Sequence, residues 1–256
     1  MIASPATITA IYRYPVKGLT PEPLSGADLL TGQTLAGDRS YAIENGPSGF
    51  DAAMPAYLPK SQFLMLMRNE RLARLAVRFH DDSGLLVVAV GGREVVRGDL
   101  NTAEGRTAIE QFMADFCADE LRGPPRILHA PGHSFSDVAR KVVSIINLAS
   151  VAEIEAAVGA AVNPLRFRAN FYVRGWPAWH EFDLVGRDIV VGTARLRIVK
   201  RIQRCAATNV DPDTGIRDLA IPAALQRRYG HSDCGLYGEV VDDGRASIGD
   251  TLVVGG

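Results

Sequence analysis

Cys205 is the residue of this sequence whose type and setting are best suited to chemistry. It stands just past an alternating strand pattern, in the stretch Arg204-Cys205-Ala206-Ala207-Thr208-Asn209-Val210-Asp211-Pro212-Asp213-Thr214-Gly215. Five basic residues lie in positions 195 to 204, and no acidic residue follows them before Asp211. Nearby positive charge stabilises a thiolate, the form of cysteine that attacks electrophiles and binds soft metals. The residues alone leave a second interpretation open, in which Cys205 packs as a small hydrophobe.

Three cations and an amide elsewhere in the chain could hold an anionic ligand. Arg168 and Asn170 stand two positions apart in Phe167-Arg168-Ala169-Asn170, and on a strand both side chains would point to the same side. An arginine binds phosphate with two parallel hydrogen bonds, and an asparagine can pair with the edge of a heterocycle. Lys17 follows Tyr14-Pro15-Val16, and Arg39 follows Gly37-Asp38. A structural pair that caps a turn, and two solvated surface cations, remain the alternatives.

These motifs together resemble a known family. The Cys205 stretch, with Phe167-Arg168-Ala169-Asn170 upstream, is similar to the MOSC domain of molybdenum-cofactor proteins. Ile11-Tyr12-Arg13-Tyr14-Pro15-Val16-Lys17-Gly18 and Gly37-Asp38-Arg39-Ser40-Tyr41-Ala42 resemble the β-barrel domain that precedes MOSC in the amidoxime-reducing components and their bacterial counterparts. The likeness runs from Ile8 to about Val253. Ala169 stands where the family usually has Pro, and Gly18 where it often has Ser.

The resemblance implies a molybdenum enzyme that reduces N-oxygenated compounds, such as N-hydroxylated bases, amidoximes or hydroxamic acids. Its cofactor would be a molybdenum–pterin (Mo-molybdopterin), with Cys205 as metal ligand and catalytic residue, because a soft thiolate suits that metal. Asn147 and Ser150 precede an expected helix, whose free N–H groups form an anion site. The cofactor-binding residues that we expect are Lys17, Gly18, Arg39, Asn147, Ser150, Arg168, Asn170, Arg204, Thr208 and Asn209.

Two other functions stay open. MOSC domains also occur attached to cofactor sulfurases, so Cys205 could carry sulfur as a persulfide in a sulfur-carrier module. The chain could also bind and deliver the pterin without turnover. Bound molybdenum with a two-electron redox response would favour the enzyme, and a persulfide without molybdenum would favour the carrier.

The cysteine count bears on electron supply. Cys117, Cys205 and Cys234 lie far apart, whereas an iron–sulfur cluster normally takes four thiolates. No cysteine run follows Val253, and no glycine-rich dinucleotide fingerprint is present. We therefore expect electrons from a separate protein, an iron–sulfur or haem carrier with its reductase. Cys117 falls on the apolar stripe of a helix, and Cys234 reads as a small apolar residue with a redox role as the alternative.

Composition and charge exclude several classes of protein. The chain of 256 residues has a formal net charge of −1, with 47% hydrophobic and 22% charged residues. This composition is that of a globular protein and gives no argument for a nucleic-acid or membrane partner. Residues 1–5 lack the basic start of a secretory signal, and the apolar stretch 142–152 is too short to cross a bilayer. We expect a cytoplasmic protein.

Three further candidates have ordinary interpretations. His129 and His133 have helical spacing, but Pro131 and Gly132 between them forbid the helix that would align a zinc site. The run 211–215 is better suited to a tight turn than to a calcium loop. Trp176 and Trp179, with Glu181, could wall a substrate pocket, although buried packing is the simpler interpretation.

The elements that must position these residues are mostly strands. Alternating or apolar runs predict strands at 7–16, 40–44, 74–79, 85–90, 142–146, 169–174, 194–202, 235–241 and 251–254. Apolar residues at i, i+3 and i+4 spacing predict a helix over 103–118. A capping box at Ser150 and a helix end at Gly159 predict a second helix. A third helix is predicted over 222–229, with Gly230 at its end. The fold class is α+β, mainly β. We expect an N-terminal barrel-like domain over 1–122 and a MOSC β-barrel domain over 125–256, with the cofactor between them.

Overall fold

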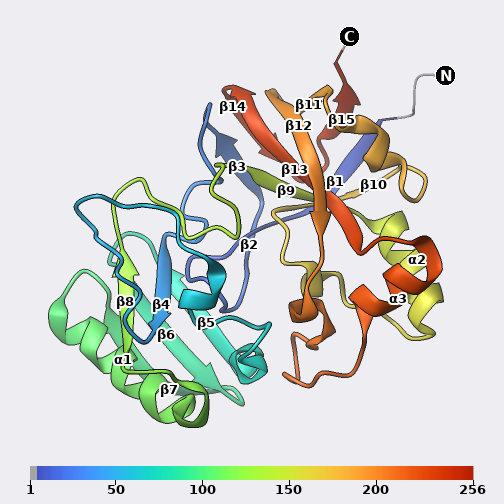
Figure 1. Cartoon of the computed structure of the whole chain (residues 1–256). Coiled ribbons are helices and arrows are strands. Elements are labelled where there is room, and N and C mark those ends of the chain that lie inside the picture. The colour runs from blue at the N-terminus through green and yellow to red at the C-terminus, as the bar shows by residue number, and fades with distance from the viewer. Residues whose placement is uncertain (1–4, 256) are drawn as a thin grey trace.

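The computed structural model describes residues 5–255, so the expectation drawn from residues 1–4 lies outside the described part. It confirms the α+β, mainly β fold, with three α-helices among the described residues. Figure 1 shows two bodies side by side: a barrel that carries α2 and α3, and a smaller assembly of two sheets that carries α1. The three predicted helices and all nine predicted strands are present, with shifts of a few residues at their ends.

Seven strands close into a barrel. Their order is β10-β9-β13-β12-β11-β15-β1, and β1 pairs back with β10. A short eighth strand, β2 (Glu22–Leu24), extends the sheet from β1. The barrel strands are β1 (Ala6–Arg13), β9 (Val143–Asn147), β10 (Phe171–Arg174), β11 (Asp188–Val191), β12 (Ala194–Gln203), β13 (Asp233–Asp242) and β15 (Thr251–Val254).

The first strand of the chain, β1, is one of the seven strands of this barrel. β1 lies between β15 and β10, with Thr7 opposite both Thr251 and Arg174. Its inward residues Ala6, Ile8 and Ile11 are buried in the barrel core. β3 (Gly26–Leu29) likewise pairs with β14 (Gly244–Ser247). The domain ranges 1–122 and 125–256 stay a prediction, but the barrel core also draws on residues that precede position 36.

The second body is built from residues between positions 41 and 129. β4 (Tyr41–Asn45) pairs with β8 (Pro125–His129), and a three-stranded sheet contains β5 (Leu75–His80), β6 (Leu85–Val90) and β7 (Arg93–Asp99). Helix α1 (Ala103–Phe116) packs against it through Ile109 and Met113. Cys117 is fully buried in the same core, which confirms its predicted place, and burial raises the pKa of its thiol to about 12.

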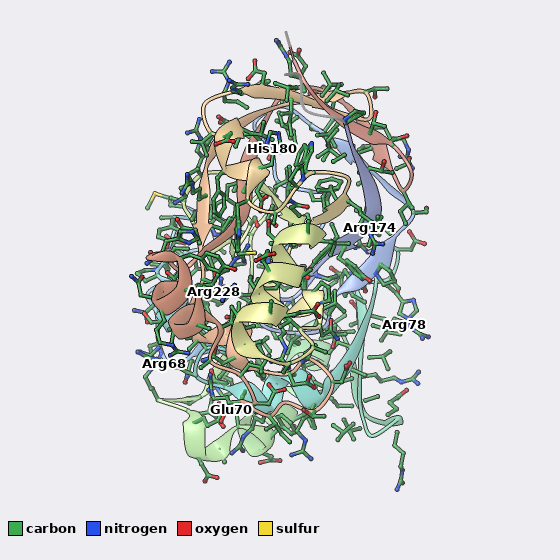
Figure 2. The ribbon with its side chains drawn as sticks, turned by 90° about the vertical axis from the view of Figure 1, so that its right-hand side faces the viewer. Arg68, Glu70, Arg78, Arg174, His180 and Arg228 are labelled. Carbon is green, nitrogen blue, oxygen red and sulfur yellow. The ribbon has the colours of Figure 1, made fainter. Side chains whose placement is uncertain are left out.

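Two helices cover one side of the barrel, as Figure 2 shows with α2 near the centre of the face. α2 (Leu148–Val158) ends at Gly159 and α3 (Ile221–Tyr229) ends at Gly230, both in the left-handed region that glycine adopts without strain. The expected capping box at Ser150 was wrong. Helix α2 begins three residues earlier than that motif predicts, because Asn147 is the N-cap and its side chain accepts a hydrogen bond from the Ala149 N–H.

Arg217 joins the two bodies. It lies in the loop before α3, and its guanidinium donates to the Leu66 and Met67 carbonyls and to the Glu70 carboxylate of the smaller body. On the barrel side it donates to the Ala206 carbonyl, 3.0 Å away. The Arg217 side chain therefore fixes the residue next to Cys205 against the 66–70 segment.

Candidate functional site

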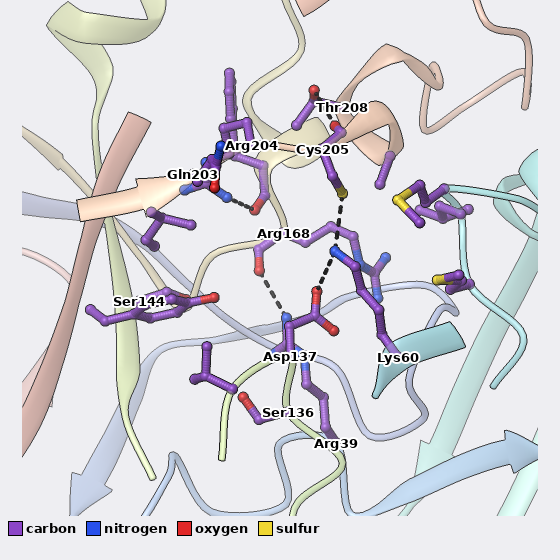
Figure 3. Close-up of a pocket in the computed structure, with 18 of the residues that line it drawn as sticks. Arg39, Lys60, Ser136, Asp137, Ser144, Arg168, Gln203, Arg204, Cys205 and Thr208 are labelled. Atoms are coloured by element: carbon purple, nitrogen blue, oxygen red, sulfur yellow. Dashed lines mark hydrogen bonds and ion pairs between the residues drawn. The ribbon is translucent and has the colours of Figure 1, made fainter. Parts of the chain in front are cut away.

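A cavity of about 370 Å³ lies where the two bodies meet. The smaller body and the segment after β1 contribute Lys17, Gly18, Arg39 and Lys60, and the barrel contributes Arg168, Asn170, Arg204, Cys205 and Thr208. Eight of the eleven residues that the sequence nominated for the site therefore share one cavity. Figure 3 shows Cys205 and Lys60 facing each other across it.

Cys205 stands at the end of β12 and directly before a 3₁₀ turn over Ala206–Asn209. Its side chain is partly exposed, and the Lys60 ammonium lies 3.4 Å from the Sγ atom. Lys60 begins the short 3₁₀ turn Lys60–Gln62 in the smaller body. Burial would lower the pKa of Lys60, but the charges of Asp137 and Cys205 raise it, so the ammonium form is favoured beside the sulfur.

Asp137 links two lysines of the cavity. Its carboxylate contacts the Lys17 ammonium and lies 3.7 Å from that of Lys60. Lys17 is only 4% exposed and also donates to the Phe135 carbonyl at 2.8 Å. Burial lowers the pKa of Lys17, whereas the pKa of Asp137 falls below its usual range because the two lysines outweigh the effect of burial. Lys17 is thus a buried, paired cation and not a solvated one.

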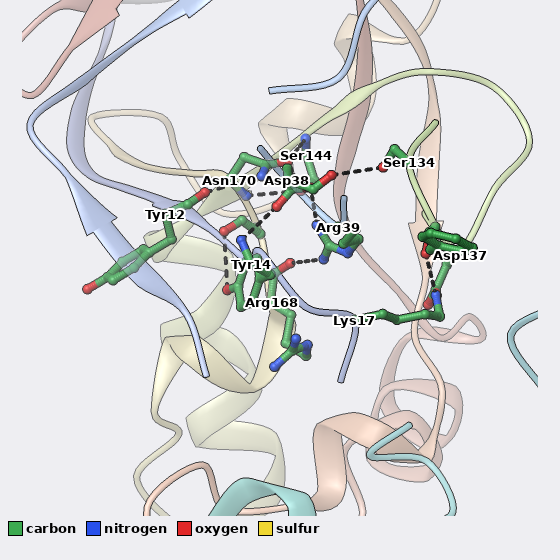
Figure 4. A network of polar contacts seen from close by, with 12 residues as sticks. Tyr12, Tyr14, Lys17, Asp38, Arg39, Ser134, Asp137, Ser144, Arg168 and Asn170 are labelled. Carbon is green, nitrogen blue, oxygen red and sulfur yellow. Dashed lines mark hydrogen bonds and ion pairs between the residues drawn. The ribbon is translucent and has the colours of Figure 1, made fainter. Parts of the chain in front are cut away.

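Two arginines meet over the ring of Tyr14 (Figure 4). The guanidinium carbon of Arg39 lies 4.7 Å from the ring centroid and that of Arg168 lies 4.3 Å away. Arg39 pairs with Asp38 and donates to the Arg168 carbonyl at 3.0 Å. The guanidinium of Arg168 makes no hydrogen bond or ion pair within residues 5–255. An uncompensated guanidinium in a cavity wall is suited to bind an anion.

The expectation that Arg168 and Asn170 share one face of a strand was wrong. Arg168 follows the 3₁₀ turn Pro164–Phe167 in the left-handed conformation, with φ of 50°, and β10 begins only at Phe171. The buried Asn170 side chain donates to the Tyr12 carbonyl and accepts from the backbone and hydroxyl of Ser144. Asn170 lines the cavity, yet its amide already ties β1 to β9.

Arg204 and Thr208 hold the backbone around Cys205. The Arg204 guanidinium donates to the carbonyl of Cys234 at 2.7 Å and to that of Phe167 at 2.9 Å. The buried Thr208 hydroxyl donates to the Cys205 carbonyl at 3.0 Å and closes the 3₁₀ turn. These contacts place the thiol on the cavity wall.

Asn147, Ser150 and Asn209 lie away from the cavity, which corrects their expected place. The Asn147 amide and the Ser150 hydroxyl donate to the Glu181 carboxylate at 2.9 and 2.7 Å. Asn209 accepts from the backbone N–H of Ile221 at the start of α3. These side chains satisfy polar groups at helix starts, and Asn147 and Ser150 are fully buried.

Several residues of the cavity were not found from the sequence. Lys60 begins a short 3₁₀ turn and Asp137 lies in an irregular loop, and an isolated charge in such a place is ordinarily solvated. Only their distance to Cys205 and Lys17 reveals them. Lys200 and Arg201 were counted only as part of a basic run, and Tyr237, opposite Lys200 on β13, carried no signal.

The remaining candidates do not belong to this cavity. Cys234 is fully buried, and burial raises the pKa of its thiol to about 12. Trp176 is buried in the barrel core and Trp179 packs against the same core.

Within residues 5–255 no cluster of three His, Cys, Asp or Glu side chains is arranged to hold a metal ion. In the same range no helix has the length and apolarity needed to span a bilayer.

Comparison with known proteins identifies both halves of the chain. The MOSC N-terminal beta barrel domain family matches residues 5–122, and the MOSC domain family matches residues 130–253. Among solved structures, the YUAD protein from Bacillus subtilis aligns over 98% of this chain and 96% of its own, at 13% identity and a TM-score of 0.46.

Curated relatives match this chain at low identity. The human mitochondrial amidoxime-reducing component 1 is 29% identical over 254 residues, which cover 89% of this chain and 73% of the relative. The bovine mitochondrial amidoxime reducing component 2 is 28% identical over 124 residues, 43% of this chain. That match spans only about a third of the bovine protein, 36% of its length. The chain therefore belongs to the MOSC domain family, with the MOSC N-terminal β-barrel domain ahead of its MOSC domain.

Proposed function

We propose that this protein is a molybdenum-cofactor-dependent oxidoreductase that reduces N-hydroxylated compounds. The observation that carries the proposal is the accessible Cys205 thiol beside the Lys60 ammonium, on the wall of a cation-lined cavity. The names of the relatives, which are amidoxime-reducing components, supply the substrate class.

The residues present fit such a cofactor. Cys205 offers a soft thiolate, the ligand type that a molybdenum centre takes from protein, and Lys60 stabilises that thiolate. The guanidinium of Arg168 stacks on Tyr14 but makes no hydrogen bond or ion pair within residues 5–255, so it suits the anionic group of a pterin. The bound cofactor would supply two-electron redox chemistry that removes the oxygen of the substrate. The chain's own part is to hold the anion, orient the substrate and keep the thiol in place.

Electrons would come from a separate electron-transfer protein. Cys117 and Cys234 are buried in two different cores, so the described residues bring no set of thiolates together for a cluster of their own. The small N-oxygenated substrate would then be the second partner. The cytoplasmic location stays a prediction.

The proposal is tested by elemental analysis and by substitution of the thiol. Freshly purified protein should hold molybdenum near one equivalent, and Cys205→Ser and Cys205→Ala should lose turnover of benzamidoxime with an unchanged melting temperature. Cys234→Ala is the matched control, because that thiol faces a core and not the cavity. Wild-type turnover in the Cys205→Ala variant would refute the assignment.

The sulfur-carrier alternative uses the same contact, since an ammonium also stabilises a persulfide anion. Intact-mass measurement separates the two functions. One added sulfur atom on Cys205 in a protein free of molybdenum would favour the carrier over the enzyme.

A further inference from the structure

A second cavity, of about 310 Å³, adjoins the cavity that contains Cys205. The two cavities share the lining residues Gly18, Leu66, Arg166, Arg168 and Ala207. Ala207 belongs to the 3₁₀ turn that directly follows Cys205. The turn beside the thiol is therefore also part of the wall between the two cavities.

The inner surface of the second cavity is mainly apolar. Its apolar side chains come from both bodies and from the segment after β1, and they include Leu19, Pro21, Leu66, Leu75, Leu165 and Val210. The charge of Arg166 is balanced from outside the cavity by Asp211 and Asp218. Apolar surface of this kind gains free energy when a ligand displaces the water from it. The second cavity therefore suits the hydrophobic part of a ligand.

Exposed residues line the second cavity on both bodies. Arg74 and Ala76 lie at its edge on the smaller body, and Asp213 lies at its edge on the barrel side. At the wall that the two cavities share, Arg217 donates to the carbonyls of Leu66 and of Ala206. A ligand can thus enter between the exposed residues and extend toward a wall that is fixed beside Cys205.

The volumes of the two cavities suit a cofactor and a substrate together. Pockets that bury a drug-sized ligand have volumes of about 300–1,000 Å³, and each of these cavities is near the lower end of that range. A pterin between Cys205 and Arg168 would occupy the first cavity. The N-hydroxylated group of a substrate has to lie near the thiol, so a large substrate needs further space for the rest of its atoms. The second cavity is such a space.

We propose that the second cavity holds the hydrophobic part of the substrate, so that the preferred substrates are N-hydroxylated compounds with a bulky apolar group. This inference rests on the proposed function and adds the size and polarity of the substrate to it. The N-hydroxylated group lies on the Cys205 side of the shared wall, and the apolar group packs against Leu165 and Val210. A small compound leaves this apolar surface in contact with water.

The test compares benzamidoxime with 4-butylbenzamidoxime, using reduced viologen dye as the electron donor. The wild-type protein should favour the butyl compound by about ten-fold or more in kcat/KM, mainly through KM, because each buried methylene contributes about four-fold. Ala76→Trp puts a large ring at the exposed edge of the second cavity. It should remove most of the preference and leave the turnover of benzamidoxime near that of the wild type.

Two further variants make the test specific. Ala152→Trp is the matched control, because Ala152 is an exposed alanine on α2 that lines neither cavity. Leu165→Ala removes an apolar side chain from the barrel side of the second cavity, so it should also reduce the preference. Melting temperature and molybdenum content show whether each variant keeps its fold and its cofactor.

Three outcomes would overturn the inference. Equal kcat/KM for the two compounds in the wild type would remove the preference for a bulky apolar group. An unchanged preference in Ala76→Trp would place the butyl group elsewhere. Loss of molybdenum from Ala76→Trp, with normal content in Ala152→Trp, would assign the second cavity to the cofactor.

Calorimetric binding of the two compounds distinguishes failure of this inference from failure of the proposed function. If the protein reduces neither compound, the proposed function fails. Tighter binding of 4-butylbenzamidoxime that weakens in Ala76→Trp, but not in Ala152→Trp, would still support the second cavity as a binding site. Equal binding of the two compounds to the wild type would overturn it without any measurement of activity.

Discussion

At the Cys205 thiol, the chemistry depends on a residue that lies 145 positions away in the sequence. Lys60 brings a positive charge beside the sulfur, and Asp137 contacts both Lys60 and Lys17 at the same wall. The cations of the cavity differ in their protein partners. Arg168 stacks on Tyr14 but makes no hydrogen bond or ion pair within residues 5–255, whereas Lys17 is paired with Asp137 and donates to the Phe135 carbonyl.

This difference predicts separate effects for the two cations. Arg168→Gln removes a charge that no carboxylate of residues 5–255 pairs with, so cofactor retention should fall by about one to two powers of ten at limiting cofactor, as expected for about 1.5–3 kcal/mol of a charged contact. Its melting temperature should stay near that of the wild type. Lys17→Ala should lower both retention and melting temperature, because it also frees the Phe135 carbonyl and Asp137. Molybdenum content and thermal scans measure the two effects. Full molybdenum occupancy in Arg168→Gln would show that this arginine is a structural residue.

Among the elements, helix α2 shows how a local motif can mislead. The sequence around Ser150 fits a capping box, but Asn147 caps the helix and, with Ser150, satisfies the buried Glu181 carboxylate. Burial raises the pKa of Glu181 despite these hydrogen bonds. The start of α2 is thus a buried polar cluster in contact with the segment 177–181.

Asn147→Ala should therefore affect stability and not cofactor binding. It removes a helix cap and one of the donors to Glu181, at a cost of about 2–3 kcal/mol in the free energy of unfolding. Urea unfolding and molybdenum content measure the two properties. Thr102→Ala is a milder matched variant, since Thr102 caps α1 at an exposed helix start. A folded Asn147→Ala protein without molybdenum would restore Asn147 to the cofactor site.

For the whole molecule, the cavity depends on how the two bodies are joined. β1 carries the chain from the barrel into the smaller body, and Arg217 holds the segment 66–70 against Ala206. Since each body contributes part of the wall, loosening this contact should weaken the site without unfolding either core.

Arg217→Gln should uncouple the two bodies. It loses several charged hydrogen bonds at a partly exposed position, for which we expect about 1–2 kcal/mol. Tryptophan fluorescence reports the barrel through Trp176 and Trp179, and labelling of the buried Cys117 reports the smaller body. The two unfolding curves should coincide in the wild type and separate in Arg217→Gln. Coincident curves in the variant would contradict the role of Arg217, and Arg227→Gln on the exposed side of α3 serves as control.

The source of electrons can be argued only from the residues of the whole chain. The sequence has no dinucleotide fingerprint, and two of its three thiols are buried. The purified protein should be inert with NADH or NADPH alone and active with reduced viologen dye. Benzamidoxime consumption with each donor is the measurement. Turnover with NADH alone would reveal a cofactor site that the cavity does not account for.

Local patterns in the sequence were sufficient to predict most of the helices and strands and to single out the motif around Cys205. Apolar residues repeating every 3.6 positions predicted that Cys117 lies on the core face at the end of α1. Alternating apolar and polar residues predicted β12 before Cys205, and Gly159 and Gly230 predicted the ends of two helices. These features depend on neighbours within a few residues, so the linear order of residue types carries them. The metal-ligand role of Cys205, drawn from its motif, stays a prediction.

Only the tertiary structure decided which charges meet. Lys60 and Asp137 reach Cys205 and Lys17 across more than a hundred positions, and β1 closes a barrel made otherwise of residues after 143. Arg168 lies outside the expected strand because it is itself the left-handed residue that ends the 3₁₀ turn before β10. Such contacts depend on the path of the folded chain and on which residues become buried. The spacing of neighbouring residues in the sequence does not predict either of them. The sequence thus supplied the thiol and its strand, and the packing of two bodies supplied the cavity around it.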